Sequence, residues 1–215
     1  RITAVKTFFR YCAKQKWITS SPAESISQLR IRHKVGATFT KAQAAKIIEQ
    51  PDLTKFTGLR DYAIILTFLH TGVRLSELGA MNIQDVSHAD RALNVQRTKN
   101  RYARRIPMSK RLREVLTVYM KARGTVEGED ALFLTENDTR LSVRQIQYQL
   151  KHYGDKVGIS CNPHVFRRTF AKNKIQAGVD VFRVQALMGH SDLEVLKRYY
   201  AIFSKDLDDV IEQGL

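Results

Sequence analysis

The chain has 215 residues, and 43% of them are apolar, which favours a packed globular fold over disorder. Its 36 Lys and Arg residues outnumber 21 Asp and Glu residues, so the formal net charge is +15. This charge favours a polyanionic partner, nucleic acid first, although a ribosome-associated or membrane-attracted basic protein would also carry it. No apolar run is long enough to span a membrane, so no membrane partner is expected. Two distant cysteines, Cys12 and Cys161, favour buried or half-buried thiols in a reducing, cytoplasmic compartment.

The first 39 residues combine helical stretches with a basic segment. Apolar residues at helical spacing predict a helix over residues 2–15, and Ser21-Pro22 is expected to open a short second helix. Residues 30–36 are basic and contain a glycine, which predicts a linker lying on a phosphate backbone. The chain does not begin with Met and starts inside a helical pattern, so we expect it to be a fragment of a longer protein.

From Thr40 onward, capping residues and apolar periodicity predict a mainly α domain with a small three-stranded antiparallel sheet, an α+β fold. Polar turns separate the predicted strands, which lie at Val86, residues 93–96 and residues 103–106. Predicted helices cover residues 41–50, 59–70, 75–81, 110–122, 143–157, 163–177, 181–188 and 205–213, and a capping box at Ser191 and Glu194 predicts one more helix, which carries Tyr199.

Two cation-bearing motifs lie in the first half of this domain. Arg74 stands at a helix start, where backbone N–H groups favour an anion, and Glu77 one turn later can hold its guanidinium. The alternative is an ordinary surface Arg–Glu pair. The second motif is a predicted hairpin with five cations in the nine residues 97–105. Its tip can reach a DNA groove and its Lys99 can deliver a proton, although a solvated basic turn would have the same composition.

Two further motifs lie near the end of the chain. His164 and Arg167 are three residues apart in the first two turns of a predicted helix, whose positive end suits a phosphate. The alternative is a capping histidine followed by a surface cation. His190 follows a glycine turn, and Tyr199 stands nine positions later on a capped helix. Taken alone, such a tyrosine is more often a packing residue than a nucleophile.

In this order the motifs resemble the tyrosine recombinase, or phage integrase, family: an arginine with a nearby acid, a hairpin lysine, His-x-x-Arg, Gly-His and then a tyrosine. The resemblance covers residues 40–203. Residues 1–30 resemble, less specifically, the last helices of that family's DNA core-binding domain. The resemblance therefore implies a core-binding remnant over residues 1–30, a basic linker over 31–39 and a catalytic domain over 40–215.

The family's functional residues carry over by position. Arg74 and Arg167 match the two arginines that grip the scissile phosphate, and Glu77 matches the acid that braces the first of them. Lys99 matches the hairpin lysine that acts as general acid, but the glycines that often flank it are absent here. The resemblance thus implies a phosphate clamp with a built-in proton donor.

His164 and His190 match the family's two histidines, which assist by hydrogen bonding and proton transfer. Tyr199 matches the nucleophile, and this assignment rests on its spacing from His190 because Tyr200 is adjacent. Further cations expected to contact DNA are Arg30, Arg32, Lys34, Arg101, Arg104, Arg105 and Arg168.

The resemblance implies an enzyme that cuts and rejoins double-stranded DNA at specific recombination sites through a 3′-phosphotyrosyl intermediate, with no metal, cofactor or ATP. It also implies a homotetramer on DNA in the nucleoid. Residues 204–215 have an apolar stripe at helical spacing and are expected to pack against a neighbouring protomer. The alternatives are a type IB topoisomerase-like enzyme, a non-catalytic DNA-binding protein on a recombinase scaffold, and a plain helical nucleic-acid-binding module.

Overall fold

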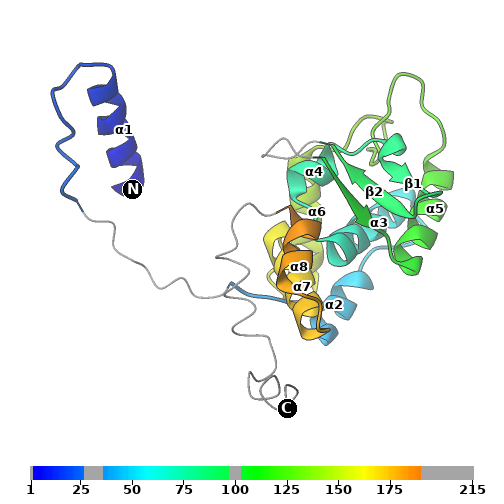
Figure 1. The fold of residues 1–215 in the computed structure, drawn as a ribbon. Helices are drawn as coiled ribbons and strands as arrows, with labels where there is room; N and C mark the ends of the chain where they lie inside the picture. The colour runs from blue at the N-terminus through cyan, green and yellow to red at the C-terminus, as the bar shows by residue number, and fades with distance from the viewer. Residues whose placement is uncertain (1, 27–35, 97–102, 190–215) are drawn as a thin grey trace, which may run out of the picture. The chain divides into compact units, whose positions relative to one another are not determined.

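The computed structural model describes residues 2–26, 36–96 and 103–189. The chain divides into two compact units, residues 1–34 and 35–215 (Figure 1). The first unit contains α1 (Ile2–Lys14), as the periodicity predicted. Residues 22–25 form turns and bends, so this part of the predicted second helix is wrong. A stretch this short makes too few helical hydrogen bonds to offset the cost of helix nucleation.

The larger unit contains the remaining helices and the sheet. The predicted mainly α fold with a three-stranded antiparallel sheet is confirmed. Its identity as a catalytic domain beginning at residue 40, preceded by a linker and a core-binding remnant, stays a prediction. The helices that the structure describes in this unit are α2 (Lys41–Ile48), α3 (Phe56–Thr71), α4 (Leu75–Gly79), the 3₁₀ helix η1 (Ile83–Asp85), α5 (Lys110–Arg123), α6 (Val143–Lys156), α7 (Pro163–Gln176) and α8 (Val181–Met188).

The sheet is a meander of β1 (Val86–Ser87), β2 (Ala92–Val95) and β3 (Arg104–Pro107). The central strand pairs antiparallel with both neighbours, and in the second pairing Leu93 lies opposite Ile106. Side chains alternate between the two faces of a strand. Ile106 is buried, and the side chain at position 104, two residues before it, therefore points to the same inner face.

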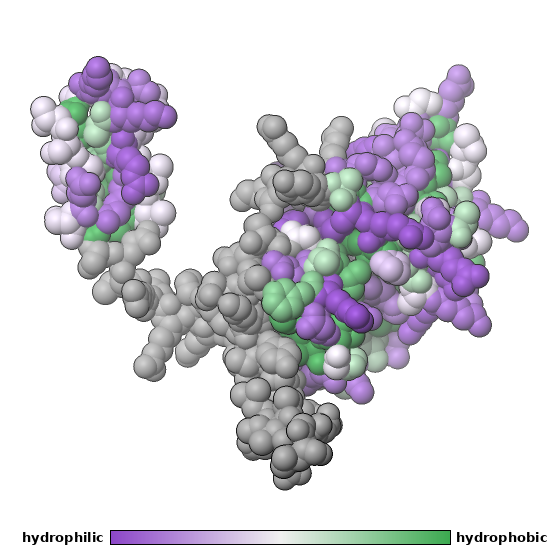
Figure 2. Space-filling model, in the orientation of Figure 1, coloured by the Kyte–Doolittle hydropathy of each residue, from purple (hydrophilic) through white to green (hydrophobic). Residues whose placement is uncertain are grey.

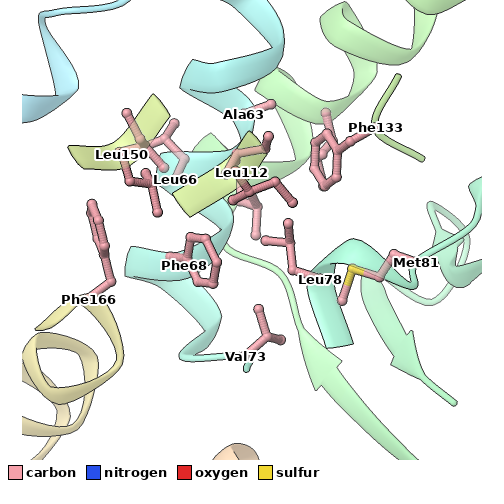
Figure 3. Close-up of a cluster of buried hydrophobic side chains, with 14 of the residues drawn as sticks. Ala63, Leu66, Phe68, Val73, Leu78, Met81, Leu112, Phe133, Leu150 and Phe166 are labelled. Carbon is pink, nitrogen blue, oxygen red and sulfur yellow. The ribbon is translucent and has the colours of Figure 1, made fainter. Parts of the chain in front are cut away.

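The core of the larger unit forms around α3, which packs against α5 and α7. Figure 3 shows side chains that converge there, among them Phe68 of α3, Leu112 of α5 and Phe166 of α7. Burial of such side chains contributes about 25 cal/mol per Å² of apolar surface removed from water. Hydrophilic residues cover most of the face of this unit that Figure 2 shows. The core thus provides a fixed frame for polar groups at the helix ends.

Two smaller findings concern the cysteines and the helix lengths. Cys12 and Cys161 are buried free thiols, as predicted. Burial raises the pKa of the Cys161 thiol to about 12, so it stays protonated near neutral pH. Within the described residues, the structure contains no helix that is both long enough and apolar enough to cross a membrane.

Candidate active site

The candidate site begins at the turn between α3 and α4. Gly72 ends α3 in the left-handed conformation, with φ of 62°, and its N–H donates to the carbonyl of Phe68. A Cβ at this position would lie 2.5 Å from the ring of Phe170, so the turn requires glycine for its conformation and for its space. Two residues later, Arg74 is the N-cap of α4. The turn thereby places Arg74 at the edge of the core.

Among the residues that the structure describes, Glu77 is the only carboxylate that pairs with Arg74 and with Arg104 of β3. It is buried, with 2% of its surface exposed. Its carboxylate accepts from the backbone N–H of Arg74 at 2.8 Å and from Nη1 of Arg74 at 2.8 Å. It also accepts from Nη1 and Nη2 of Arg104, at 2.9 and 2.7 Å. Two guanidinium groups therefore share one buried carboxylate.

These bonds decide the ionisation of Glu77. Burial alone would raise the pKa of its carboxyl, but the hydrogen bonds from Arg104 and Arg74 outweigh that effect and hold the pKa below its ordinary value. Glu77 is therefore a carboxylate at neutral pH and fixes the two guanidinium groups that donate to it.

Arg104 was predicted to contact DNA, and the structure places its side chain on the inner face of β3. Its side chain is only 11% exposed, and its Nε donates to the carbonyl of Leu187 at 2.9 Å. The reason is strand alternation, which directs Arg104 inward with Ile106 and leaves Arg105 outside. Arg105 is 59% exposed and bonds to Asp90, also at the surface. The periodicity of β3 was the signal that could have found the inward arginine.

Arg167 enters the site from α7. Asn162 caps this helix by accepting from the N–H groups of His164 and Val165, and Pro163 occupies its first position. Arg167 is 7% exposed, and it donates from Nη1 to the carbonyl of Gly72 and from Nη2 to that of Met188. Burial, and then the nearby charge of Arg74, lower its pKa to about 9. It therefore remains a cation at neutral pH.

All three arginines donate to the end of α8. Arg104 bonds to the carbonyl of Leu187, Arg167 to that of Met188, and Arg74 to that of Gly189 at 2.6 Å. Carbonyls at a helix C-terminus carry partial negative charge and favour cations. The cluster of three arginines and Glu77 nevertheless keeps an excess of positive charge. Such a cluster can bind an anion with several preorganised N–H donors.

The other predicted site residues fall into two groups. His164 is exposed in the first turn of α7, one turn before Arg167. Arg168 donates from Nε to the carbonyl of Ala37 at 2.9 Å. The remaining predicted catalytic or DNA-contacting residues lie outside the described residues, and their roles stay predictions: Arg30, Arg32, Lys34, Lys99, Arg101, His190 and Tyr199.

Comparison with known proteins gives consistent results. The model of the Phage integrase family matches residues 37–205. Tyrosine recombinase XerC of Chlamydia muridarum is 33% identical over 210 residues, which cover 95% of this chain and 66% of that protein. Tyrosine recombinase XerC of Thermodesulfovibrio yellowstonii is 28% identical over 223 residues, covering all of this chain and 74% of that protein. The chain thus spans about two thirds to three quarters of these relatives.

Solved structures share the fold. The Tn1549 transposon integrase, solved in complex with circular intermediate DNA, superposes with a TM-score of 0.78 at 20% identity, over 99% of this chain and 76% of that one. The XerA recombinase superposes with a TM-score of 0.69 at 24% identity, over 99% of this chain and 72% of that one. With the family match over most of the chain, these findings show that the chain belongs to the phage integrase family of tyrosine recombinases.

Proposed function

We propose that this chain is the catalytic part of a site-specific DNA recombinase, which cuts and rejoins strands through a covalent bond to Tyr199. The observation that supports the proposal most directly is the joint placement of Arg74 and Arg167 at the end of α8, with Glu77 buried beside Arg74. The sequence motifs had assigned these three residues to one phosphate clamp. Relatives named tyrosine recombinase, and integrases and recombinases solved on DNA, support double-stranded DNA as the partner.

The proposed chemistry follows from what each group can supply. The phenol oxygen of Tyr199 attacks the scissile phosphorus, and its proton leaves to a nearby base, which His190 or His164 can provide. The arginine forks bind nonbridging phosphate oxygens as charge grows on them. The bond from phosphorus to the 5′ oxygen then breaks, and Lys99 protonates that oxygen. The products are a 3′-phosphotyrosyl bond and a free 5′ hydroxyl.

The reverse reaction explains why the proposal includes neither ATP nor a metal. The phosphotyrosyl bond conserves the energy of the phosphodiester, and a 5′ hydroxyl from another strand can attack it and release Tyr199. Arg74, Arg167 and Lys99 supply the positive charge that a divalent cation supplies in other phosphoryl-transfer enzymes. Exchange between two duplexes requires several protomers on paired sites, so the proposed working form is a tetramer on DNA.

The test uses a pool of nicked suicide duplexes with randomised arms, because a nick next to the cleavage point traps the covalent product. We expect covalent protein–DNA adducts that survive denaturing electrophoresis, and sequencing of the trapped DNA would reveal the preferred site. Tyr199→Phe should abolish the adducts and keep DNA binding nearly intact, and Tyr200→Phe is the matched control. Adducts should still form in excess EDTA. Peptide mapping that places the DNA on Tyr200 would refute the assignment of the nucleophile.

A further inference from the structure

Arg104 lies inside the candidate site but has no place in the phosphate clamp proposed above. We propose that Arg104 is a positioning residue, which holds Glu77, and through it Arg74, against the end of α8 and does not contact DNA. The inference rests on the proposed function and assigns a further residue to the same reaction.

The hydrogen bonds of Arg104 leave it poorly placed for a DNA phosphate. Each of its three guanidinium nitrogens already donates within the protein: Nη1 and Nη2 to the two oxygens of Glu77, and Nε to the carbonyl of Leu187. The paired bonds form a bidentate fork, which fixes both partners in one plane. With its side chain 11% exposed, Arg104 offers little of its guanidinium to a phosphate that approaches from solvent.

Arg74 is more exposed than Arg104, and its guanidinium makes fewer bonds to Glu77. Its side chain is 26% exposed, and only Nη1 bonds to Glu77. Its Nη2 donates to the carbonyl of Gly189, a neutral acceptor. Arg74 can therefore exchange that carbonyl for a charged phosphate oxygen while Glu77 retains it. Arg104 makes two bonds to the carboxylate and stabilises its ionised form, so it determines how firmly Arg74 is held.

Arg104 also connects the sheet to the end of α8. Its bond to Leu187 joins β3 to the last turn of the helix, two residues before Gly189. Gly189 adopts a φ of 60°, and a Cβ there would lie 2.8 Å from Nη1 of Arg104. The turn is thus shaped closely around this guanidinium. His190, one of the predicted catalytic residues, follows Gly189 directly in the sequence, so Arg104 also fixes the point from which that segment starts.

The experiment replaces Arg104 by Gln and compares it with Arg105→Gln, a substitution one position along the same strand on the exposed face. We expect Arg104→Gln to slow single-turnover adduct formation about 10-fold or more at saturating DNA. Its affinity for a duplex of generic sequence should stay within about twofold, with an unchanged salt slope. Loss of a phosphate contact would instead weaken binding and reduce the salt slope by about one. That second result for Arg104→Gln would overturn the proposal.

A double-mutant cycle tests whether Arg104 acts through Glu77. If it does, Arg104→Gln should add little to the defect of Glu77→Gln, whereas independent roles would give additive losses. Loss of Arg104 should also move the acid limb of the pH–rate profile to higher pH, because Glu77 loses two hydrogen bonds to its ionised form. Glu77→Gln should remove that limb. Additive losses combined with an unmoved acid limb would contradict a positioning role.

Two further measurements distinguish a folding defect from a catalytic defect, and failure of the positioning role from failure of the proposed function. Thermal unfolding shows whether Arg104→Gln folds; if it does not, Arg104→Lys retains the cation without the fork and takes its place in each assay. Adduct formation by Arg104→Lys at the wild-type rate would show that the fork is unnecessary and would overturn the proposal. Failure of the wild-type chain itself to form adducts would refute the proposed function, and the positioning role would fall with it. If the wild-type chain forms adducts and only the Arg104 variants are defective, the proposed function stands and the positioning role is supported.

Discussion

At the scale of single residues, the candidate site has an excess of positive charge. Within the part of the chain that the structure describes, Arg74 and Arg104 share one carboxylate, and Arg167 is buried with no carboxylate bonded to its guanidinium. Backbone carbonyls of Gly72 and Met188 satisfy its donors, but they offset its charge only partly. Burial, and then the nearby charge of Arg74, lower its pKa, which reflects this uncompensated charge. Binding of a phosphate would relieve it, which is the physical reason to place the reaction here.

The first prediction concerns the shape of Arg167. Arg167→Lys keeps the charge but cannot bond to both carbonyls and two phosphate oxygens as a planar fork does. We expect adduct formation at saturating DNA to fall by roughly 10²-fold, as when a preorganised donor is removed. Arg123→Lys is the matched control, since Arg123 is equally buried and donates to the carbonyls of Glu129 and Ala131. It should lower the melting temperature without lowering the cleavage rate of the folded enzyme. Equal cleavage defects in both variants would indicate a general loss of packing.

The sequence predicted part of this residue-level arrangement. Arg74 and Glu77 could be paired because they are three positions apart, and His-x-x-Arg singled out Arg167 in the same way. The pairing of Arg104 with Glu77 spans 27 positions and depends on where the sheet lies against α4. The contact of Tyr153 with Asp61, across 92 positions in the core, is of the same kind. Local spacing cannot reveal partners that only the packing of distant elements brings together.

At the scale of elements, helix starts with a capping side chain were the most predictable features, whereas α3, which has no side-chain cap, begins at Phe56 and not at the predicted residue 59. Thr40, Ser142, Asn162 and Asp180 each cap the helix that the sequence assigned to them, because a side chain bonding to an N–H two or three residues later is local information. The last two strands begin or end one residue away from the predicted limits. Strand limits depend on register with a partner, which sequence periodicity does not specify.

The second prediction tests the turn that connects α3 to α4. Gly72→Ala should be destabilised by about 1–2 kcal/mol for a left-handed alanine, and by a further ~1–3 kcal/mol because its Cβ would meet the Phe170 ring. Gly178→Ala is the control, since Gly178 has a φ of 77° and no atom within 4 Å of the added Cβ. Denaturant unfolding of both variants isolates the cost of the contact. Equal losses of stability would show that Phe170 moves aside without cost.

The turn between α3 and α4 supports the geometry of the candidate site as well as the stability of the fold. The carbonyl of Gly72 accepts from Arg167, so displacement of this turn by Gly72→Ala should lower cleavage as well as stability. Gly178 lies beyond the end of α7 and its alanine variant should affect stability alone. The comparison therefore separates a turn that supports the clamp from one that only ends a helix.

At the scale of the whole molecule, the third prediction concerns assembly. Residues 204–215 lie outside the described residues, and their sequence places Leu207, Val210 and Ile211 at helical spacing. A helix this short is unstable alone in water, so its apolar stripe needs a surface, which we expect a neighbouring protomer to provide. Deletion of this segment should weaken cooperative binding to paired half-sites but not affinity for a single half-site. Gel-shift titrations distinguish the two, and unchanged cooperativity would show that the segment covers its own domain.

The last prediction follows from the net charge of +15. Each phosphate that the protein neutralises releases condensed cations from the duplex, so the logarithm of the affinity should fall linearly with the logarithm of the salt concentration. About six such contacts would reduce the affinity roughly 10³-fold between ~50 and ~200 mM salt. Fluorescence anisotropy with a duplex of generic sequence measures this slope.

Single substitutions show which cations contribute to that slope. Arg105 is exposed on β3 and Arg168 is partly exposed on α7, so Arg105→Gln and Arg168→Gln should each reduce the slope by about one. Arg123 is buried and bonded to carbonyls, so Arg123→Gln removes the same charge without removing a phosphate contact and should leave the salt slope unchanged. Equal reductions in all three variants would mean that the duplex responds to total charge. An affinity that is flat from low to moderate salt would contradict binding to the phosphate backbone altogether.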